Sequence, residues 1–288
     1  MKVAVTGAGG FVGSHVVETL SRVDDVEIVA AVRREIASDR LPFGVAQVEL
    51  DIATAQPGDF DRLGRPDRLV HLAWDGLPNY RSERHVETEL PAQLRFLEAM
   101  ADGGMTSLLI AGTCYEYGLA EGELGEDRET APVTAYGEAK VALHRRLDEL
   151  RARVPFDLIW ARLFYLWGPR QAPGSLLPQL RAAVERGDRS FAMSQGDQLR
   201  DYLPVEEAAR LLAALALRGG NAGAVNICLG KPISILALVE QWLEENGRDI
   251  ALDLGQFPYP DYEPFAFWGA TDKLNRLLSD PRQSGTGA

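Results

Sequence analysis

The sequence has little cysteine and no long apolar run. Cys114 and Cys228 are its only two cysteines in 288 residues and lie far apart, so neither a disulfide framework nor a cysteine-rich metal cluster is expected. No apolar stretch approaches the roughly 18 residues that a membrane-spanning helix requires. The first residues, MKVAV, enter a strand at once, unlike a secretory signal peptide. We therefore expect a cytoplasmic protein that holds no metal and contacts no membrane.

Positive charge is also scarce. The 30 Lys and Arg residues face 42 Asp and Glu residues, so the net charge is −12 at pH 7. Proteins that bind nucleic acid or anionic membranes nonspecifically favour basic surfaces, so this balance argues against both kinds of partner. Hydrophobic residues make up 46% and charged residues 25%, as in an ordinary soluble enzyme with a large core.

The stretch 2–13, KVAVTGAGGFVG, predicts a buried strand, a glycine turn and the start of a helix. Gly7 allows a tight turn, Gly10 lets the backbone approach a pyrophosphate, and Gly13 lets the helix pack close to the strand. Free N–H groups at a helix start attract phosphate, whereas the alternative is a glycine turn that binds nothing. The residues expected to bind a dinucleotide here are Gly7, Gly10, Phe11, Val12 and Gly13.

Strands alternate with helices through the first 165 residues or so. This alternation predicts an α/β fold, a Rossmann-type doubly wound parallel sheet, in which ligands bind beyond the C-terminal strand ends. After the first strand, further strands are expected at residues 26–32, 45–50, 69–73, 105–111 and 156–161, with helices at 85–100 and 135–150.

The predicted strand ends carry the other expected cofactor contacts. Arg33 and Arg34 follow the second strand, where an acid would bond the ribose 2′-hydroxyl of NAD. Two guanidiniums suit a 2′-phosphate instead, which favours NADP(H) over NAD(H), unless both are solvated surface charges. Asp51 could accept a hydrogen bond from the adenine amino group or cap a loop. The remaining positions expected to contact the cofactor are Ile52, Leu72, Ala73 and Trp74.

The chain changes character after residue 165. Helices are expected at 176–185, 206–217 and 234–245, a strand at 224–228, a hairpin of 191–193 with 199–203 around Gly196, and loops at 121–129 and 256–268. We expect a dinucleotide-binding domain of residues 1–165, to which the chain returns around 204–230. Residues 166–203 and 231–288 would form a smaller, discontinuous substrate-binding lobe.

Tyr136 and Lys140 form a Y-x-x-x-K pattern at the start of a predicted helix, where positions i and i+4 share a face. An ammonium near a phenol favours the phenolate and so prepares the tyrosine for acid–base work. Thr113 lies at a predicted strand end on the same side of the sheet. The alternative is a surface tyrosine and a solvated lysine. We predict that Thr113, Tyr136 and Lys140 are catalytic and that the last two also contact the cofactor.

With these motifs the chain resembles the extended short-chain dehydrogenase/reductases, in particular the NAD(P)-dependent epimerase/dehydratase group that acts on nucleotide sugars. The resemblance covers about residues 1–278 and rests on TGAGGFVG, HLAW in place of HLAA, TCYEYG, YGEAK, RLFYLWGP and RDYLPV. It implies that Thr113, Tyr136 and Lys140 are the family's triad. It also implies a homodimer formed through the helices at 85–100 and 135–150.

The resemblance also assigns the substrate side of the site. It implies that Arg200, in the R-D-Y segment, holds the diphosphate of a nucleotide sugar, whereas the alternative is a salt bridge to Asp201 or Asp197. The substrate contacts that it implies are Trp74, Thr113, Cys114, Tyr115, Tyr165 and Arg200.

Several positions depart from the family pattern. Cys114 and Tyr115 stand where 4,6-dehydratases carry Asp-Glu, so 4,6-dehydration is not expected. Glu89 and Tyr165 each replace an asparagine, and Pro260 stands where relatives carry a second phosphate-binding arginine. The sugar pocket is therefore expected to differ from that of standard relatives.

Three functions are compatible with these motifs and with the departures from the family pattern. The first is NADPH-dependent reduction of the 4-keto group of a nucleoside-diphosphate 4-keto-6-deoxysugar. The second is a nucleotide-sugar 4-epimerase with tightly bound NAD. The third is a regulatory protein that binds NAD(P) without catalysis, against which the intact Thr–Tyr–Lys set speaks.

Overall fold

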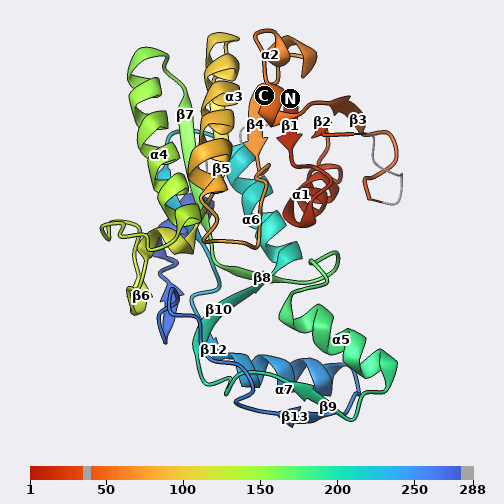
Figure 1. Cartoon of the computed structure of the whole chain (residues 1–288). Helices are drawn as coiled ribbons and strands as arrows, with labels where there is room; N and C mark the ends of the chain where they lie inside the picture. The colour runs from red at the N-terminus through yellow and green to blue at the C-terminus, as the bar shows by residue number, and fades with distance from the viewer. Residues whose placement is uncertain (35–39, 280–288) are drawn as a thin grey trace.

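The computed structural model describes residues 1–34 and 40–279, so the last part of the expected substrate lobe, 280–288, lies outside the described residues. Seven strands, all parallel to their neighbours, form the main sheet (Figure 1). Across the sheet their order is β11 (Gly223–Ile227), β7 (Asp157–Leu163), β5 (Ser107–Thr113), β4 (Arg68–His71), β1 (Lys2–Thr6), β2 (Glu27–Val32) and β3 (Ala46–Glu49). The order reverses between β1 and β4, which confirms the predicted doubly wound parallel sheet.

Helices cover both faces of this sheet (Figure 1). The helices on one face are α1 (Phe11–Leu20), α6 (Val205–Arg218) and α8 (Asp272–Ser279), and those on the other are α2 (Asp59–Arg62), α3 (Leu90–Asp102) and α4 (Ala135–Arg153). Successive strand residues alternate between the faces, so Val3 and Val5 of β1 join the first core while Ala4 joins the second. Both faces are covered, which explains the continuous apolar runs in the strands.

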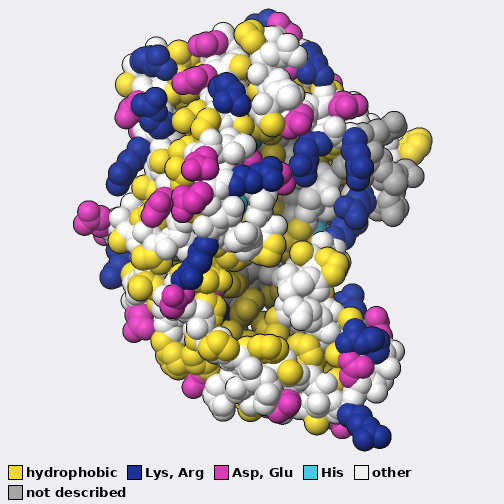
Figure 2. Space-filling model, viewed as in Figure 1, with side chains coloured by type: hydrophobic (Ala, Val, Ile, Leu, Met, Phe, Trp, Pro, Cys, Tyr) yellow, Lys and Arg dark blue, Asp and Glu magenta, His cyan; other side chains and the backbone are white. Residues whose placement is uncertain are grey.

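The rest of the chain forms a lobe below the sheet. Its elements are β8 (Tyr165–Trp167), α5 (Leu176–Arg186), β9 (Ser190–Ala192), β10 (Leu199–Pro204), β12 (Pro232–Ser234), α7 (Ile235–Glu245) and β13 (Ala251–Asp253). The strands β12, β10 and β8 form a three-stranded sheet, and α5 and α7 share a separate apolar core. Figure 2 shows the surface hollowed between the sheet layer and this lobe, with hydrophobic side chains inside the hollow.

The predicted hairpin around Gly196 is wrong. Both of its strands exist, but β9 pairs in parallel with β13, and β10 pairs with β12 and β8. The reason is that distant segments hold each strand: Phe191 and Met193 are buried against α5 and α7, whereas the Asp201 carboxylate on β10 accepts the backbone N–H of Leu229 at 2.7 Å. Neither constraint is local, so the short spacing around Gly196 misled the prediction.

Two segments predicted as loops contain strands. Residues 122–124 form β6 (Gly122–Leu124), which pairs in parallel with β14 (Phe267–Gly269). Leu124 is fully buried although the surrounding segment, 121–129, is rich in acidic residues. Each strand has only three residues, too few to show an alternating pattern, so only the distant partner reveals them. Helix α8 was not predicted.

The predicted helix at 85–100 exists but begins with one wide turn, η2 (His85–Glu89), before α3. Pro91 lies in the first turn of α3 and has no N–H to donate back to the preceding turn, which accounts for the wider geometry. None of the helices in the described part of the chain combines the length and apolarity of a bilayer-spanning segment.

The glycine turn after β1 is closely packed. Gly7 has φ of +66°, and a Cβ there would meet the Leu72 and Ala73 backbone at 2.9 Å. A Cβ at Gly13 would lie 2.1 Å from the Gly7 carbonyl oxygen. Because that neighbour is backbone, it cannot move aside without displacing the turn, so only glycine allows α1 to start this close to β1.

The substitution Gly13→Ala tests this packing. We expect it to lower the free energy of unfolding by about 1–3 kcal/mol, as overpacking of a close contact does, measured by urea unfolding. Gly174→Ala is the matched control, because nothing lies within 4 Å of its added Cβ. Equal stability of Gly13→Ala and Gly174→Ala would contradict the packing argument.

Candidate active site

A cavity of about 700 Å³ opens at the C-terminal ends of β1, β2 and β4. Nine residues predicted to bind the cofactor line it: Gly7, Gly10, Arg33, Arg34, Asp51, Ile52, Leu72, Ala73 and Trp74. Phe11, Val12 and Gly13 lie in the first turn of α1 behind this lining. Residues that the sequence analysis did not single out for the cofactor also line it, among them Thr6, Arg40, Asp75, Arg84, Thr88 and Glu89.

The cavity fits a dinucleotide. The start of α1 carries no acidic residue in its first turn and no side-chain cap at Gly10, so its N–H groups are available to an anion. The positive φ of Gly7 and the absence of a Cβ let the turn approach such a ligand closely. Thr6 stabilises the wall of the cavity that Leu72 and Ala73 form, because its hydroxyl accepts the Leu72 N–H at 3.2 Å.

Arginines surround the far end of the cavity. Arg33 and Arg34 are exposed at the end of β2, and Arg40 lines the same region. Arg33 lies 3.6 Å from Asp75, which also binds Arg84 at 2.6 Å. These positive groups are only partly matched by the shared carboxylate, so this end of the cavity suits an anion.

Asp51 caps a short helix, in line with the alternative interpretation that it is a loop cap. Its Oδ1 accepts the Ala53 N–H at 3.0 Å and so caps the short helix η1 (Ile52–Thr54). The residue also lines the cavity. A structural cap and a contact to adenine are therefore compatible at this position.

The strand β5 ends in a tight turn that carries Thr113. The Thr113 hydroxyl accepts the Tyr115 N–H at 3.3 Å, and the Glu116 carboxylate accepts the Thr113 N–H at 2.8 Å. These two bonds form a capping box at the start of η3 (Cys114–Tyr117). The spacing T-x-x-E was the available sequence signal for Glu116, which the sequence analysis did not use.

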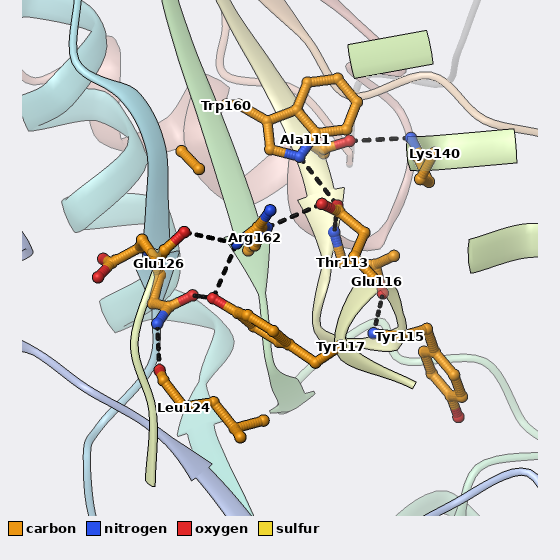
Figure 3. A network of polar contacts seen from close by, with 12 residues as sticks. Ala111, Thr113, Tyr115, Glu116, Tyr117, Leu124, Glu126, Lys140, Trp160 and Arg162 are labelled. Atoms are coloured by element: carbon orange, nitrogen blue, oxygen red, sulfur yellow. Dashed lines mark hydrogen bonds and ion pairs between the residues drawn. The ribbon is translucent and has the colours of Figure 1, made fainter. Parts of the chain in front are cut away.

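Glu116 is fully buried and has several partners (Figure 3). Besides the Thr113 N–H, its carboxylate accepts the indole N–H of Trp160 at 2.8 Å and the Nε of Arg162 at 2.8 Å. Arg162 in turn donates to the Tyr117 hydroxyl at 3.0 Å. A buried carboxylate that satisfies this many donors holds the turn after β5 in one position.

Tyr136 lies on the first turn of α4, close to Thr113. The Thr134 hydroxyl caps this helix by accepting the Gly137 N–H at 3.1 Å, and the Tyr136 N–H donates to the Tyr80 carbonyl at 3.0 Å. Burial raises the pKa of Tyr136, and a hydrogen bond with Thr113 opposes the rise. The pKa shift is thus opposite to the one predicted from the Y-x-x-x-K pattern.

Lys140 explains this difference. Its Nζ donates to the Ala111 carbonyl at 2.9 Å and lies 3.7 Å from the centre of the Trp74 ring but 5.8 Å from that of Tyr136. Burial lowers the pKa of Lys140 to about 7, although Glu116 and Glu89 oppose the shift. The ammonium is therefore near Tyr136 but is directed at a carbonyl and an indole.

Trp74 forms the wall between the cavity and this pair. Its ring lies 5.7 Å from that of Tyr136, and its indole N–H donates to Nδ1 of His85 at 3.1 Å. Among the described residues that line the cavity, neither Tyr136 nor Lys140 appears. The structure thus brings Thr113, Tyr136 and Lys140 together and separates the last two from the cavity by one indole.

Two of the predicted substrate residues, Tyr165 and Arg200, lie next to Cys114 and Tyr115 of the turn after β5, which comprises Thr113–Tyr117. Arg200 is fully buried and pairs with Glu263 at 2.9 Å, not with Asp201 or Asp197 as the alternative proposed. The Tyr115 hydroxyl lies 3.4 Å from that of Tyr165 and donates to Glu263 at 2.7 Å. Cys114 is buried next to them, and burial raises its pKa.

Glu263 had no signal in the sequence. It lies 148 residues after Tyr115, in a segment rich in proline and aromatics that was predicted as loop. Only the tertiary structure places its carboxylate between Arg200 and Tyr115.

Comparison with known proteins agrees with this geometry. Residues 3–228 match the model of the NAD dependent epimerase/dehydratase family. The chain belongs to this family. It is therefore an enzyme of the extended short-chain dehydrogenase/reductase type, an NAD(P)-dependent oxidoreductase or epimerase, as the motifs predicted.

Individual relatives span almost the whole chain. A dTDP-6-deoxy-L-talose 4-dehydrogenase (NAD(+)) from Aggregatibacter actinomycetemcomitans is 27% identical over 94% of this chain and 100% of its own length. The structure of MoeE5 in complex with UDP-glucuronic acid and NAD is 27% identical and covers 96% of this chain and 92% of its own, with a TM-score of 0.80. A UDP-N-acetylglucosamine 4-epimerase from Methanobrevibacter ruminantium M1 shares the fold, with a TM-score of 0.84, 22% identity and coverage of 98% and 94%.

The burial of Lys140 predicts a pH-dependent stability. Its pKa falls from 10.5 to about 7 on folding, so between these values the unfolded chain binds more protons and stability rises with pH. Below pH 7 the folded protein bears the full cost of the buried charge. We expect the free energy of unfolding of wild type, relative to Lys140→Met, to increase between pH 7 and pH 9 in urea titrations.

The control for this experiment is Lys231→Met, which removes an exposed lysine. Its difference from wild type should not change over the same pH range. A Lys140→Met difference that is constant from pH 6 to pH 9 would show that Lys140 keeps its ordinary pKa on folding.

Proposed function

We propose that this enzyme reduces the 4-keto group of a nucleoside-diphosphate 4-keto-6-deoxysugar with NADPH. The observation that carries the proposal is the convergence of Thr113, Tyr136 and Lys140 beside the glycine-turn cavity. The similar 4-dehydrogenase named above acts, by its name, at C4 of a 6-deoxysugar nucleotide, which supports a reaction at the same carbon. Cys114 and Tyr115, in place of an acid pair, argue against dehydration.

The chain's own residues account for the proton movement. A bound nicotinamide cofactor supplies the hydride that a carbonyl carbon accepts. The side chains of Thr113 and Tyr136 lie close enough to interact, and a carbonyl oxygen between the two hydroxyls would accept from both. Tyr136 would give its proton to the C4 oxygen as the alcohol forms. Lys140 lies close enough to stabilise the phenolate left behind, and solvent protons then restore the tyrosine.

The surroundings suit this step. Thr113, Tyr136 and Lys140 are all more than nine-tenths buried, so their interactions with a reacting oxygen are weakly screened. Trp74 and His85 hold the wall next to them. For the cofactor to reach Tyr136, the Trp74 side chain would have to turn away from Lys140.

The preference for NADP(H) over NAD(H) is part of the proposal. Arg33 and Arg34 at the end of β2 and Arg40 beside them would bind a ribose 2′-phosphate. No acid follows β2 directly; Asp75, from the end of β4, is already shared by two arginines. The 4-dehydrogenase relative uses NAD(+) by its name, so this chain would differ from it in the cofactor.

A nucleotide-sugar 4-epimerase is the second candidate, because the family includes epimerases and the same three residues would oxidise and then reduce C4. An epimerase regenerates its cofactor, so the cofactor would remain bound through gel filtration and would not be consumed. A ketoreductase consumes one equivalent of NADPH for each sugar reduced.

The substitution Tyr136→Phe tests the proton donor. We expect kcat for NADPH oxidation with a 4-keto-6-deoxysugar nucleotide to fall about 10²–10⁴-fold, because only the hydroxyl is lost. Binding of NADPH, followed by its fluorescence, should remain within a few-fold of wild type. Full turnover in Tyr136→Phe would exclude the proposed role.

The double substitution Arg33→Ala with Arg34→Ala tests the cofactor preference. Loss of charge-assisted bonds to the 2′-phosphate should lower the ratio of kcat/KM for NADPH over NADH by about tenfold to a hundredfold. Arg22→Ala is the control, because Arg22 is exposed just beyond the C-terminal end of α1 and pairs with Glu18. A wild-type enzyme that prefers NADH would overturn this part of the proposal.

A further inference from the structure

The carboxylate of Glu263 lies between Arg200, on β10 of the lobe, and Tyr115, in the turn after β5. Its Oε2 accepts Nη2 of Arg200 at 2.9 Å, and its Oε1 accepts the Tyr115 hydroxyl at 2.7 Å. The Glu263 side chain is 13% exposed, whereas that of Arg200 is not exposed at all. The Glu263 carboxylate therefore binds both Arg200, which is expected to hold phosphate, and Tyr115, which lies two residues after Thr113.

Arg200 is fixed in place by groups other than Glu263. Its Nη1 donates to the carbonyl oxygens of Leu199 at 2.8 Å and Phe265 at 3.0 Å, and its guanidinium lies 4.9 Å from the centre of the Phe267 ring. The guanidinium thus has two carbonyl oxygens that position it and one carboxylate, that of Glu263, that balances its charge. Its Nε–H, though buried, has no acceptor among the described residues.

An arginine in this state requires an anion. A buried guanidinium without a negative partner is strongly destabilising, so a molecule that removes Glu263 must itself bring negative charge. A phosphate brings negative charge, and it offers a guanidinium more acceptor oxygens than a carboxylate does. Pro260, at the position where relatives carry a second phosphate-binding arginine, is uncharged, so Glu263 and a phosphate would compete for Arg200.

The segment that carries Glu263 is attached by backbone hydrogen bonds at its end, where the carbonyls of Phe265 and Ala266 accept the N–H groups of Leu199 and Gly122, and by polar contacts at its surface. Asp261 pairs with Arg81, Tyr259 bonds to Asp197, and the Phe265 N–H donates to Glu121 at 3.1 Å, all in exposed positions. Such contacts contribute little each. Movement of the Glu263 side chain alone would break its bonds to Arg200 and Tyr115, while the Phe265 carbonyl oxygen keeps its bonds to Arg200 and to the Leu199 N–H.

We propose that Glu263 is a stand-in for the substrate's phosphate: a phosphate of the sugar nucleotide replaces its carboxylate at Arg200, and Tyr115 is released from Glu263 in the same exchange. The inference rests on the proposed function, in that Arg200 is taken as a phosphate ligand. The exchange makes the site selective for an anionic sugar derivative. It also reduces the affinity for that derivative, because the phosphate must displace a bonded carboxylate.

The substitution Glu263→Gln tests the exchange in the full-length protein. The amide keeps the shape and can still accept the Tyr115 hydroxyl, but it cannot match the charge of Arg200. We expect UDP or dTDP, titrated in a calorimeter, to bind Glu263→Gln about tenfold or more tightly than wild type. The thermal unfolding temperature of Glu263→Gln should be lower than that of wild type, and either nucleotide should raise it more.

Asp261→Asn is the matched control. It removes the same charge from the same segment but leaves the pair of Glu263 and Arg200 intact. Its affinity for UDP and dTDP should stay within about twofold of wild type, since its partner Arg81 is exposed and screened by solvent. Equal gains in Asp261→Asn and Glu263→Gln would mean a general charge effect and would overturn the proposal.

The remaining outcomes separate this inference from the proposed function. Unchanged or weaker nucleotide binding by Glu263→Gln, with wild type active on a 4-keto sugar nucleotide, would overturn the stand-in role alone. Tighter binding by Glu263→Gln in a protein that reduces no 4-keto sugar nucleotide would support the stand-in role and refute the reductase. If neither protein binds UDP or dTDP, the role of Arg200 and the exchange both fail.

Discussion

The site depends on the buried carboxylate of Glu116. It lies in the turn after β5, where it accepts the backbone N–H of Thr113, and its other donors, Trp160 and Arg162, come from the neighbouring strand β7. A buried charge with fewer partners would cost several kcal/mol; with these three it makes one arrangement of the turn strongly preferred. The position of the Thr113 hydroxyl is thereby tied to the register of two central strands.

A second anchoring carboxylate joins the lobe to the sheet. Asp201 accepts the N–H groups of Leu229 and Gly230, two and three residues after the end of β11, at 2.7 and 2.8 Å. Adjacent strand residues point to opposite sides, so Asp201 holds the lobe against the sheet while Arg200 faces Glu263, which also binds Tyr115 in the turn after β5. The R-D pair thus combines the attachment of the lobe with a buried cation that pairs with Glu263.

Much of the nucleotide-binding half could be predicted because its signals are local. The glycines before α1 are required by contacts within a few residues or by the adjacent strand end, and the parallel strands are apolar runs because both faces are covered. The hairpin around Gly196 and the loops at 121–129 and 256–268 were wrong in whole or part, because three-residue strands take their partners from distant segments.

The sequence by itself determined the family, the parallel sheet and the residue types of the Thr–Tyr–Lys set, since spacing and backbone conformation encode them within short stretches. Only the tertiary structure decided how those side chains are used: Lys140 faces a carbonyl and the Trp74 ring, burial raises the pKa of Tyr136, and Glu263 rather than Asp201 or Asp197 neutralises Arg200. Desolvation and ion pairing depend on every group packed around a charge, and those groups are brought together from distant parts of the chain.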